Sequence, residues 1–193
     1  TFLKIQGRTL TEDKQGIIRL AVDENSTRII GFEDMIRGRI EFEQKIVGDL
    51  SIAKDLKTAL YNFAVVVDDM EMEISHVIRG EDHISNTPKQ ILIFEALGAS
   101  VPRYAHLPLL LGTDRSKLSK RHGATSVDQY REAGYLPEAL VNFLALLGWT
   151  PPRWREGGQA GEIVTKNEVI EQFGLEGVHK SGAVFDIKKL NWM

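Results

Sequence analysis

The order of strand-like and helix-like segments between residues 73 and 112 limits the folds open to this chain more than any other feature. The segment EISHVIRG reads as a β-strand and ends in the polar cluster RGEDHISNT. A helix comes next, and the apolar segment HLPLLLG then reads as another strand. This order predicts a βαβ unit of an α/β fold, with its functional groups at the carboxyl ends of the strands.

The ends of the expected helices carry recognisable signals. The helix of the βαβ unit is expected to begin with Thr87 as N-cap, Pro88 at the first helical position and Gln90 completing a capping box. Gly98 is expected to stop it. Later helices are expected over Ser126–Ala133 with Gly134 after it, from Pro137 to Gly148, and from the Thr165–Glu168 capping box to Gly174.

Two further kinds of strand are expected before the βαβ unit. The segments STRIIGFEDMI and GRIEFEQKIVGDL place charges at alternating positions, which predicts a half-exposed sheet. The segment YNFAVVVDD holds a continuous apolar run, Phe63–Val67, which predicts a strand buried on both faces. The acids that follow, Asp68 and Asp69, could bind Mg²⁺, but such pairs more often form caps and turns, so no metal site is predicted there.

The composition excludes several classes of protein. A chain of 193 residues with 42% hydrophobic content can bury a substantial core, in one domain with an appendage or in two small domains. It has neither a run of about eighteen apolar residues nor a charged-then-apolar leader, so no membrane span or signal peptide is expected. It has no cysteine, which excludes disulfides and thiolate ligands and suits a cytosolic protein.

A basic loop follows the last strand of the βαβ unit, although the chain as a whole has a net charge of −3. In RSKLSKR, Lys117 and Lys120 lie three residues apart, close enough to contact a single polyanion. An isolated pair of this kind is typical of a solvated surface loop. Its place directly after a buried strand instead favours a hinged lysine loop beside a nucleotide.

A second set of polar residues points to a carboxylate. Tyr61 opens one expected strand and Arg79 closes another, so both could face the same crevice. The arginine fork can hold a carboxylate bidentately, with the tyrosine hydroxyl beside it. The alternative for Arg79 is an ion pair with a neighbouring acid: Glu81, Asp82 or Asp69. The five histidines lack metal-ligand spacing, and neither a G-x-S-x-G motif nor a P-loop is present, so covalent catalysis by the protein is not expected.

Four long motifs closely resemble those of bacterial-type glutamyl-tRNA synthetase, a class I aminoacyl-tRNA synthetase. They occur in the family's order and extend from about Ile30 to the end: LYNFAVVVDDMEMEISHVIRGEDHISNTPKQILIFEALG, HLPLLLGTDRSKLSKRHGATSV, GYLPEALVNFLALLGW and KSGAVFDIKKLNWM. KLSKR is similar to the family's Lys-Met-Ser-Lys-Ser signature, with Leu118 and Arg121 as the departures. The His-Ile-Gly-His signature and an anticodon-binding domain are not found in the sequence.

The resemblance implies the second half of a Rossmann-like catalytic domain. Residues 1–55 are expected to be part of the connective insertion that handles the tRNA acceptor end, a looser match than the rest. Residues 56–150 would then be the second half of the catalytic domain, with the KLSKR loop. Residues 151–193, which begin in the proline- and glycine-rich segment WTPPRWREGGQAGE, would start a helical stem-contact domain.

The resemblance also implies roles for individual residues. Lys120 is expected to contact ATP and stabilise the pyrophosphate leaving group, with Lys117 and Ser119 assisting. Tyr61 and Arg79 match positions that hold the glutamate substrate. The other ATP-side residues are expected in a turn, Glu81, Asp82 and His83, and in a strand whose backbone meets adenine, Leu109 and Leu110.

The family's reaction activates L-glutamate with ATP, accompanied by Mg²⁺, and transfers it to the acceptor arm of tRNA(Glu) in protein synthesis. We therefore expect a cytoplasmic, monomeric parent enzyme with no zinc in this segment and no membrane contact, and a 193-residue chain that is inactive alone. One alternative is the paralogue that glutamylates a queuosine-modified tRNA. Another is a non-catalytic tRNA-binding module of the same fold.

Overall fold

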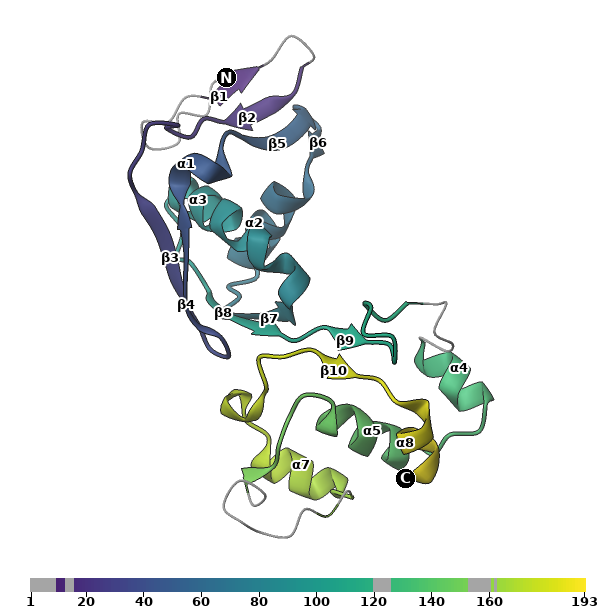
Figure 1. The fold of residues 1–193 in the computed structure, drawn as a ribbon. Coiled ribbons are helices and arrows are strands. Elements are labelled where there is room, and N and C mark those ends of the chain that lie inside the picture. Colours follow the sequence, from purple (N-terminus) through teal and green to yellow (C-terminus); the bar gives the residue numbers. More distant parts are fainter. Residues whose placement is uncertain (1–9, 13–15, 120–125, 153–160, 162) are drawn as a thin grey trace. The chain divides into compact units, whose positions relative to one another are not determined.

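The chain forms two compact units in the computed structural model, which describes residues 10–12, 16–119, 126–152, 161 and 163–193 (Figure 1). The first unit is Thr1–His106 and the second is Leu107–Met193. This division follows packing and does not coincide with the expected functional boundaries near residues 55 and 150. The functional division of the chain therefore stays a prediction.

A four-stranded sheet of order β4-β3-β8-β7 forms the part of the first unit that matters most for function. Strands β3 (Ile29–Asp34) and β4 (Gly38–Glu43) form an antiparallel hairpin. Strand β8 (Arg103–Leu107) pairs in parallel with β3 through Asp34 and Tyr104, and β7 (His76–Gly80) lies next to β8. Since helix α3 connects the neighbouring strands β7 and β8, the strand–helix–strand prediction is confirmed.

The remaining strands of the first unit form an antiparallel sheet: β1 (Leu10–Glu12), β2 (Ile18–Leu20), β5 (Leu50–Asp55) and β6 (Thr58–Ala59), in that order. The short helix α1 (Gln44–Val47) lies between β4 and β5 along the chain. In β3, Ile30 and Phe32 are buried while Ile29 and Glu33 are exposed. This alternation confirms the prediction of a half-exposed sheet in this part of the chain.

The prediction of a buried strand in YNFAVVVDD is wrong, because the segment forms helix α2 (Tyr61–Glu71). A continuous apolar run has no period of its own and fits a strand or a packed helix equally well. In the structure Phe63 and Val66, three residues apart, pack on the core, and Val66 is completely buried. Asp68 and Asp69 consequently lie in the last turns of a helix and not at the end of a strand.

Helix α3 (Thr87–Leu97) begins one residue earlier than expected, after the short 3₁₀ helix η1 (Glu81–Asn86). Asn86 occupies the N-cap position and no side chain caps the helix, so the predicted Thr87–Gln90 capping box is wrong. The Gln90 amide donates instead to Oδ1 of Asn62, 3.0 Å away. The predicted stop is confirmed, since Gly98 has the left-handed φ of 70° that follows many helices.

Both sheets and helices α2 and α3 contribute to one apolar core. It includes Ile30 on β3, Ile52 on β5, Leu92 on α3 and Tyr104 on β8, each at most 6% exposed. Because its members come from every layer of the unit, the core fixes β7 and β8 relative to the helices that follow and precede them. The carboxyl ends of these strands are thereby held in place.

In the second unit, the predicted helices are confirmed as α4 (Val127–Glu132), α5 (Pro137–Leu146) and α7 (Lys166–Gln172). Capping boxes form at Ser126 with Gln129 and at Thr165 with Glu168. The 3₁₀ turn η3 (Leu175–Gly177) and helix α8 (Ile187–Trp192) follow, and the small core lies around Tyr130, Phe143 and Leu190.

The segment HLPLLLG does not form one strand as expected. Strand β8 ends at Leu107, and β9 (Leu110–Leu111) is a separate strand that pairs in parallel with β10 (Ala183–Val184). Pro108 lies between them, and a proline has no N–H to donate to a sheet ladder. In Figure 1, β9 and β10 run side by side.

Candidate active site

Arg79 is the centre of a polar cluster at the carboxyl ends of β3, β7 and β8. Its Nε donates to Nε2 of His106 at 3.2 Å, and its Nη2 donates to Oγ1 of Thr87 at 2.8 Å and to the carbonyl oxygen of His83 at 3.5 Å. The guanidinium carbon lies 5.5 Å from the ring centroid of Tyr104. Arg79 is thus held by hydrogen bonds to His106, Thr87 and His83 and by contact with the Tyr104 ring.

All the hydrogen-bond partners of Arg79 within the described residues are neutral acceptors. The predicted alternative of an ion pair with Glu81 is not found, because Glu81 pairs with Arg37. Asp69 acts on Arg79 only electrostatically. The guanidinium keeps its charge, and its hydrogen bonds of defined geometry to the described residues use Nε and Nη2, while the Tyr61 hydroxyl interacts with it as a further neutral group. A charged arginine among such neutral neighbours is what a site for a carboxylate requires.

Asp34 and His106 form a buried pair behind Arg79. Nδ1 of His106 lies 2.6 Å from Oδ2 of Asp34, and both side chains are 0% exposed. The backbone N–H groups of Ile36, Arg37 and His106 also donate to the Asp34 carboxylate, at 3.0, 2.8 and 3.0 Å. An ionised, acceptor-only carboxylate with this many donors fixes the His106 proton on Nδ1.

The pKa values of the pair agree with an ionised acid and a neutral imidazole. Burial raises the pKa of Asp34, but the hydrogen bonds from the Arg37 backbone, the His106 ring and the Ile36 backbone outweigh it, so the pKa lies below its usual range. Burial lowers the pKa of His106 and outweighs the opposing effect of Asp34. Nε2 of His106 therefore carries a lone pair, which accepts the Nε–H of Arg79.

Tyr61 and His83 lie beside this cluster. Tyr61 is the first residue of α2 and is 53% exposed, and its hydroxyl is 3.3 Å from Nδ1 of His83, which belongs to η1. Burial lowers the pKa of Arg79, whereas Tyr104, Tyr61 and Asp69 act against this effect. Tyr61 thus reaches Arg79 from the start of a helix, although it was expected at the start of a strand.

The first part of the lysine loop is tied to strand β9 in the second unit. The backbone N–H of Leu118 donates to the carbonyl of Leu110 at 2.8 Å, and Lys117 forms an antiparallel bridge with Leu111. Between them Gly112 and Ser116 close a turn by a 2.8 Å backbone hydrogen bond. The loop is therefore a small hairpin up to Leu118, on which the side chain of Lys117 is exposed.

The predicted site residues are divided between the two units. Four lie in the first unit: Tyr61, Arg79, Asp82 and His83. Four lie in the second: Leu109, Leu110, Lys117 and Ser119. Lys120 lies outside the described residues.

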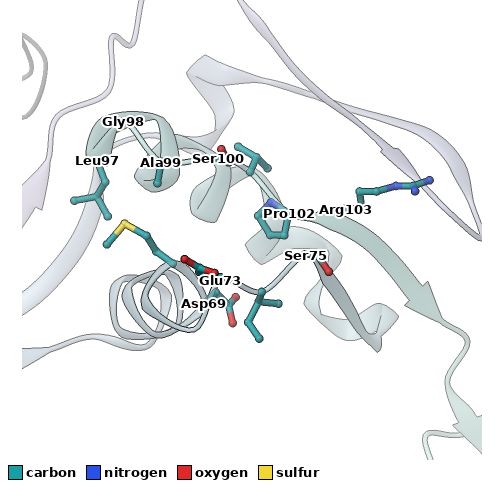
Figure 2. A pocket seen from close by; sticks show the side chains of 12 residues that line it. Asp69, Glu73, Ser75, Leu97, Gly98, Ala99, Ser100, Pro102 and Arg103 are labelled. Carbon is teal, nitrogen blue, oxygen red and sulfur yellow. The ribbon is translucent and has the colours of Figure 1, made fainter.

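A separate hollow of about 630 Å³ does not have Arg79 among the residues that line it (Figure 2). Ser75 and Arg103, which line it, stand at the amino ends of β7 and β8. Asp69 and Glu73 contribute carboxylates at the end of α2. Open α/β sheets bind their ligands at the opposite, carboxyl ends of the strands, so the Arg79 cluster is the better candidate site.

The sequence prediction did not identify Asp34, Thr87 and His106 as a group. The sequence pattern shows His106 only as one of five scattered histidines and predicts Thr87 as a helix cap. Asp34 is the last residue of β3, and His106 is the next to last of β8. The sequence pattern placed His106 at the start of the expected strand HLPLLLG and not at the end of β8, so it held no local signal that groups these residues.

Two other roles to compare with the described residues are metal binding and membrane crossing. No group of three or more histidine, cysteine, aspartate or glutamate side chains in the described ranges could hold a metal ion. Within the same ranges, no helix has the length and apolar character needed to cross a membrane.

Residues 4–192 match the family model for the tRNA synthetases of class I (E and Q), catalytic domain. The chain is 57% identical over 182 residues to a glutamate–tRNA ligase of Desulforamulus reducens, and this alignment covers 94% of the chain and 36% of that protein. It is 56% identical over 182 residues to a glutamate–tRNA ligase of Aquifex aeolicus, covering 94% of the chain and 37% of that protein.

A solved structure is also similar, that of a glutamate tRNA ligase from Elizabethkingia meningosepticum in complex with its amino acid. It aligns with a TM-score of 0.78 and 37% identity, over 91% of this chain and 37% of that chain. The chain thus spans little more than a third of the length of the relatives it matches. The family match over nearly all of its residues shows that the chain belongs to the class I tRNA synthetases of the glutamate and glutamine type, with the Rossmann-like α/β fold of their catalytic domain.

Proposed function

We propose that this chain is part of an enzyme that ligates L-glutamate to tRNA(Glu) through a glutamyl-adenylate. The relatives named as glutamate–tRNA ligases support this proposal. The observation that carries it in the structure is the Arg79 guanidinium, which neutral acceptors hold in place without neutralising its charge. A carboxylate of glutamate would complete its hydrogen bonds through Nη1, with the Tyr61 hydroxyl beside it.

The proposed reaction has two steps. The α-carboxylate of glutamate attacks the α-phosphorus of ATP in line, the bond to the bridging oxygen breaks, and pyrophosphate leaves. The 2′-hydroxyl of the terminal adenosine of the tRNA then attacks the glutamyl carbonyl carbon, loses its proton, and displaces AMP. Neither step uses a protein nucleophile, so positioning and charge stabilisation are what the side chains must supply.

We assign the ATP side of this reaction to the lysine loop and its neighbours. Lys120 would stabilise the charge that develops on pyrophosphate, with Lys117 and Ser119 assisting. The other proposed ATP contacts come from Asp82 and His83 and from the backbone of Leu109 and Leu110. Mg²⁺ would be carried by the ATP phosphates, as it commonly is where phosphoryl groups are transferred.

We keep the three functional regions that the sequence predicts along the chain. Residues 1–55 would contact the tRNA acceptor arm, residues 56–150 would form the second half of the catalytic domain, and residues 151–193 would begin a stem-contact domain. The full-length enzyme would act as a monomer in the cytoplasm. The 193 residues alone would form no adenylate, because the His-Ile-Gly-His signature is not among them.

The test is glutamate-dependent exchange of ATP with pyrophosphate by the full-length protein, with tRNA present, followed by charging of tRNA(Glu). Lys120→Ala should lower the turnover rate far more than it weakens glutamate binding, whereas Lys57→Ala, at an exposed lysine between β5 and β6, should leave both unchanged. Unchanged turnover in Lys120→Ala would remove the assigned role. Transfer of glutamate only to a queuosine-modified tRNA would replace tRNA(Glu) as the substrate.

A further inference from the structure

The Asp34–His106 pair lies where it can control Arg79 without touching a bound substrate. Asp34 ends β3, His106 lies near the end of β8, and Arg79 lies near the end of β7. The three side chains form one chain of hydrogen bonds, from Oδ2 of Asp34 to Nδ1 of His106 at 2.6 Å and from Nε2 of His106 to Nε of Arg79 at 3.2 Å. The carboxylate is thus one imidazole away from the guanidinium.

We propose that Asp34 and His106 are positioning residues that set the orientation of the Arg79 guanidinium toward the glutamate carboxylate. The proposal rests on the function assigned to Arg79 above. Asp34 holds the imidazole with its proton on Nδ1, so that Nε2 presents a lone pair to Arg79. The other tautomer would place an N–H against the N–H of Arg79, and the orienting bond would be lost.

The imidazole also separates the charge of Asp34 from that of Arg79. A carboxylate in direct contact with Arg79 would form an ion pair and compete with the substrate for the same donors. With His106 in between, Arg79 is fixed in direction by a neutral acceptor and keeps its charge for the substrate. Thr87, buried at 0% exposure, fixes Nη2 in the same way at 2.8 Å.

The pair is itself held rigidly, as a positioning role requires. Nε of Arg37 donates to the carbonyl of His106 at 3.2 Å, and the same side chain forms an ion pair with Glu81 of η1. The Asp34 carboxylate accepts three backbone N–H groups besides the imidazole. A buried ionic group is weak evidence for stability, so its coupling to Arg79 is the better explanation of its place here.

Two substitutions at His106 separate its two hydrogen bonds. In His106→Gln the side-chain amide reaches the position of Nε2, so its oxygen can still accept from Arg79. In His106→Asn the amide reaches only the position of Nδ1, so it can still meet Asp34 but offers Arg79 no acceptor. The two variants are similar in polarity and differ in which bond they keep.

The experiment is steady-state aminoacylation by the full-length protein, with the KM for glutamate, the KM for ATP and kcat measured separately. We expect His106→Asn to raise the KM for glutamate about tenfold or more, as loss of a hydrogen bond to a charged group implies, while His106→Gln recovers most of this loss. The KM for ATP should stay unchanged in both. Equal KM values for glutamate in His106→Asn and the wild type, or equal losses in both variants, would overturn the proposal.

Two controls keep the result interpretable. Ile93→Val, a small change in the buried core, should lower the thermal midpoint without altering the KM for glutamate. If His106→Asn does not fold, Asp34→Asn tests the same chain of bonds, and an unchanged KM for glutamate there would overturn the proposal. A wild-type protein that charges no tRNA with glutamate would instead remove the proposed function, which separates the two failures.

Discussion

Replacing Arg79 by lysine keeps the positive charge but removes the planar fork. A lysine amine cannot make the bidentate contact with a carboxylate that a guanidinium makes, so at least one charge-assisted hydrogen bond to the substrate is lost. Such a bond contributes about 1.5–3 kcal/mol, which corresponds to a decrease of about 10- to 150-fold in kcat/KM for glutamate. Most of the loss should appear as a higher KM for glutamate, because ATP does not contact this residue in the proposed arrangement.

The same substitution should also lower stability. Nε2 of His106 and Oγ1 of Thr87 both accept hydrogen bonds from Arg79, and both side chains are 0% exposed. Leaving one such buried acceptor unsatisfied costs about 1–3 kcal/mol of unfolding free energy. Denaturant unfolding of the full-length protein would measure this loss beside the kinetic one.

Arg103→Lys is the matched control for Arg79→Lys. Arg103 is an exposed arginine at the amino end of β8, the strand next to β7, and lies on the far end of the sheet from Arg79. It should change neither the KM for glutamate nor the stability by a measurable amount. The reasoning fails if Arg79→Lys charges tRNA with an unchanged KM for glutamate, or if both lysine variants lose activity equally.

Three other predictions concern stability. Because burial lowers the pKa of His106 in the folded protein, the unfolded state binds more protons below about pH 6.5. The unfolding free energy should therefore fall as the pH is lowered from 6.5, and less steeply in His106→Gln, which pH-dependent denaturant titrations would show. Gly98→Ala should cost about 1 kcal/mol because φ there is 70°. Thr165→Ala should cost about 1 kcal/mol through loss of the capping box. Denaturant unfolding measures both, with Ser100→Ala as a change at an exposed residue for comparison.

Local signals predicted the parts of the fold that local interactions decide. Gly98 ends α3 because glycine adopts the left-handed conformation there without steric cost. Thr165 is the N-cap of α7 because its hydroxyl accepts a hydrogen bond from the N–H of Glu168. The strand prediction for YNFAVVVDD is wrong because the five consecutive apolar residues Phe63–Val67 carry no period, and packing against α3 and β5 decides that the segment is a helix. Tyr61 nevertheless reached the site, since the first residue of α2 and the end of β7 lie on the same side of the unit.

The same limit explains why Thr87 was misinterpreted. Its hydroxyl has the spacing of a helix cap, but it lies 2.8 Å from Nη2 of Arg79 and 3.2 Å from Nε2 of His106. Thr87 is itself the first residue of the helix, Asn86 is at the N-cap position, and no side chain caps the helix. The Thr87 hydroxyl instead contacts these two tertiary partners. The failure of a local rule thus marks a residue of the candidate site.

The Asp34–His106 pair could not be predicted from local pattern, because 72 residues separate its members. Only the parallel pairing of β3 with β8, through Asp34 and Tyr104, brings the two strand ends together. Once that pairing is known, a general rule applies, since polar groups at the carboxyl ends of neighbouring parallel strands face one region. Arg79 is the next to last residue of β7, the strand next to β8. The strand order that brings Asp34 and His106 together therefore also places Arg79 within hydrogen-bond distance of His106.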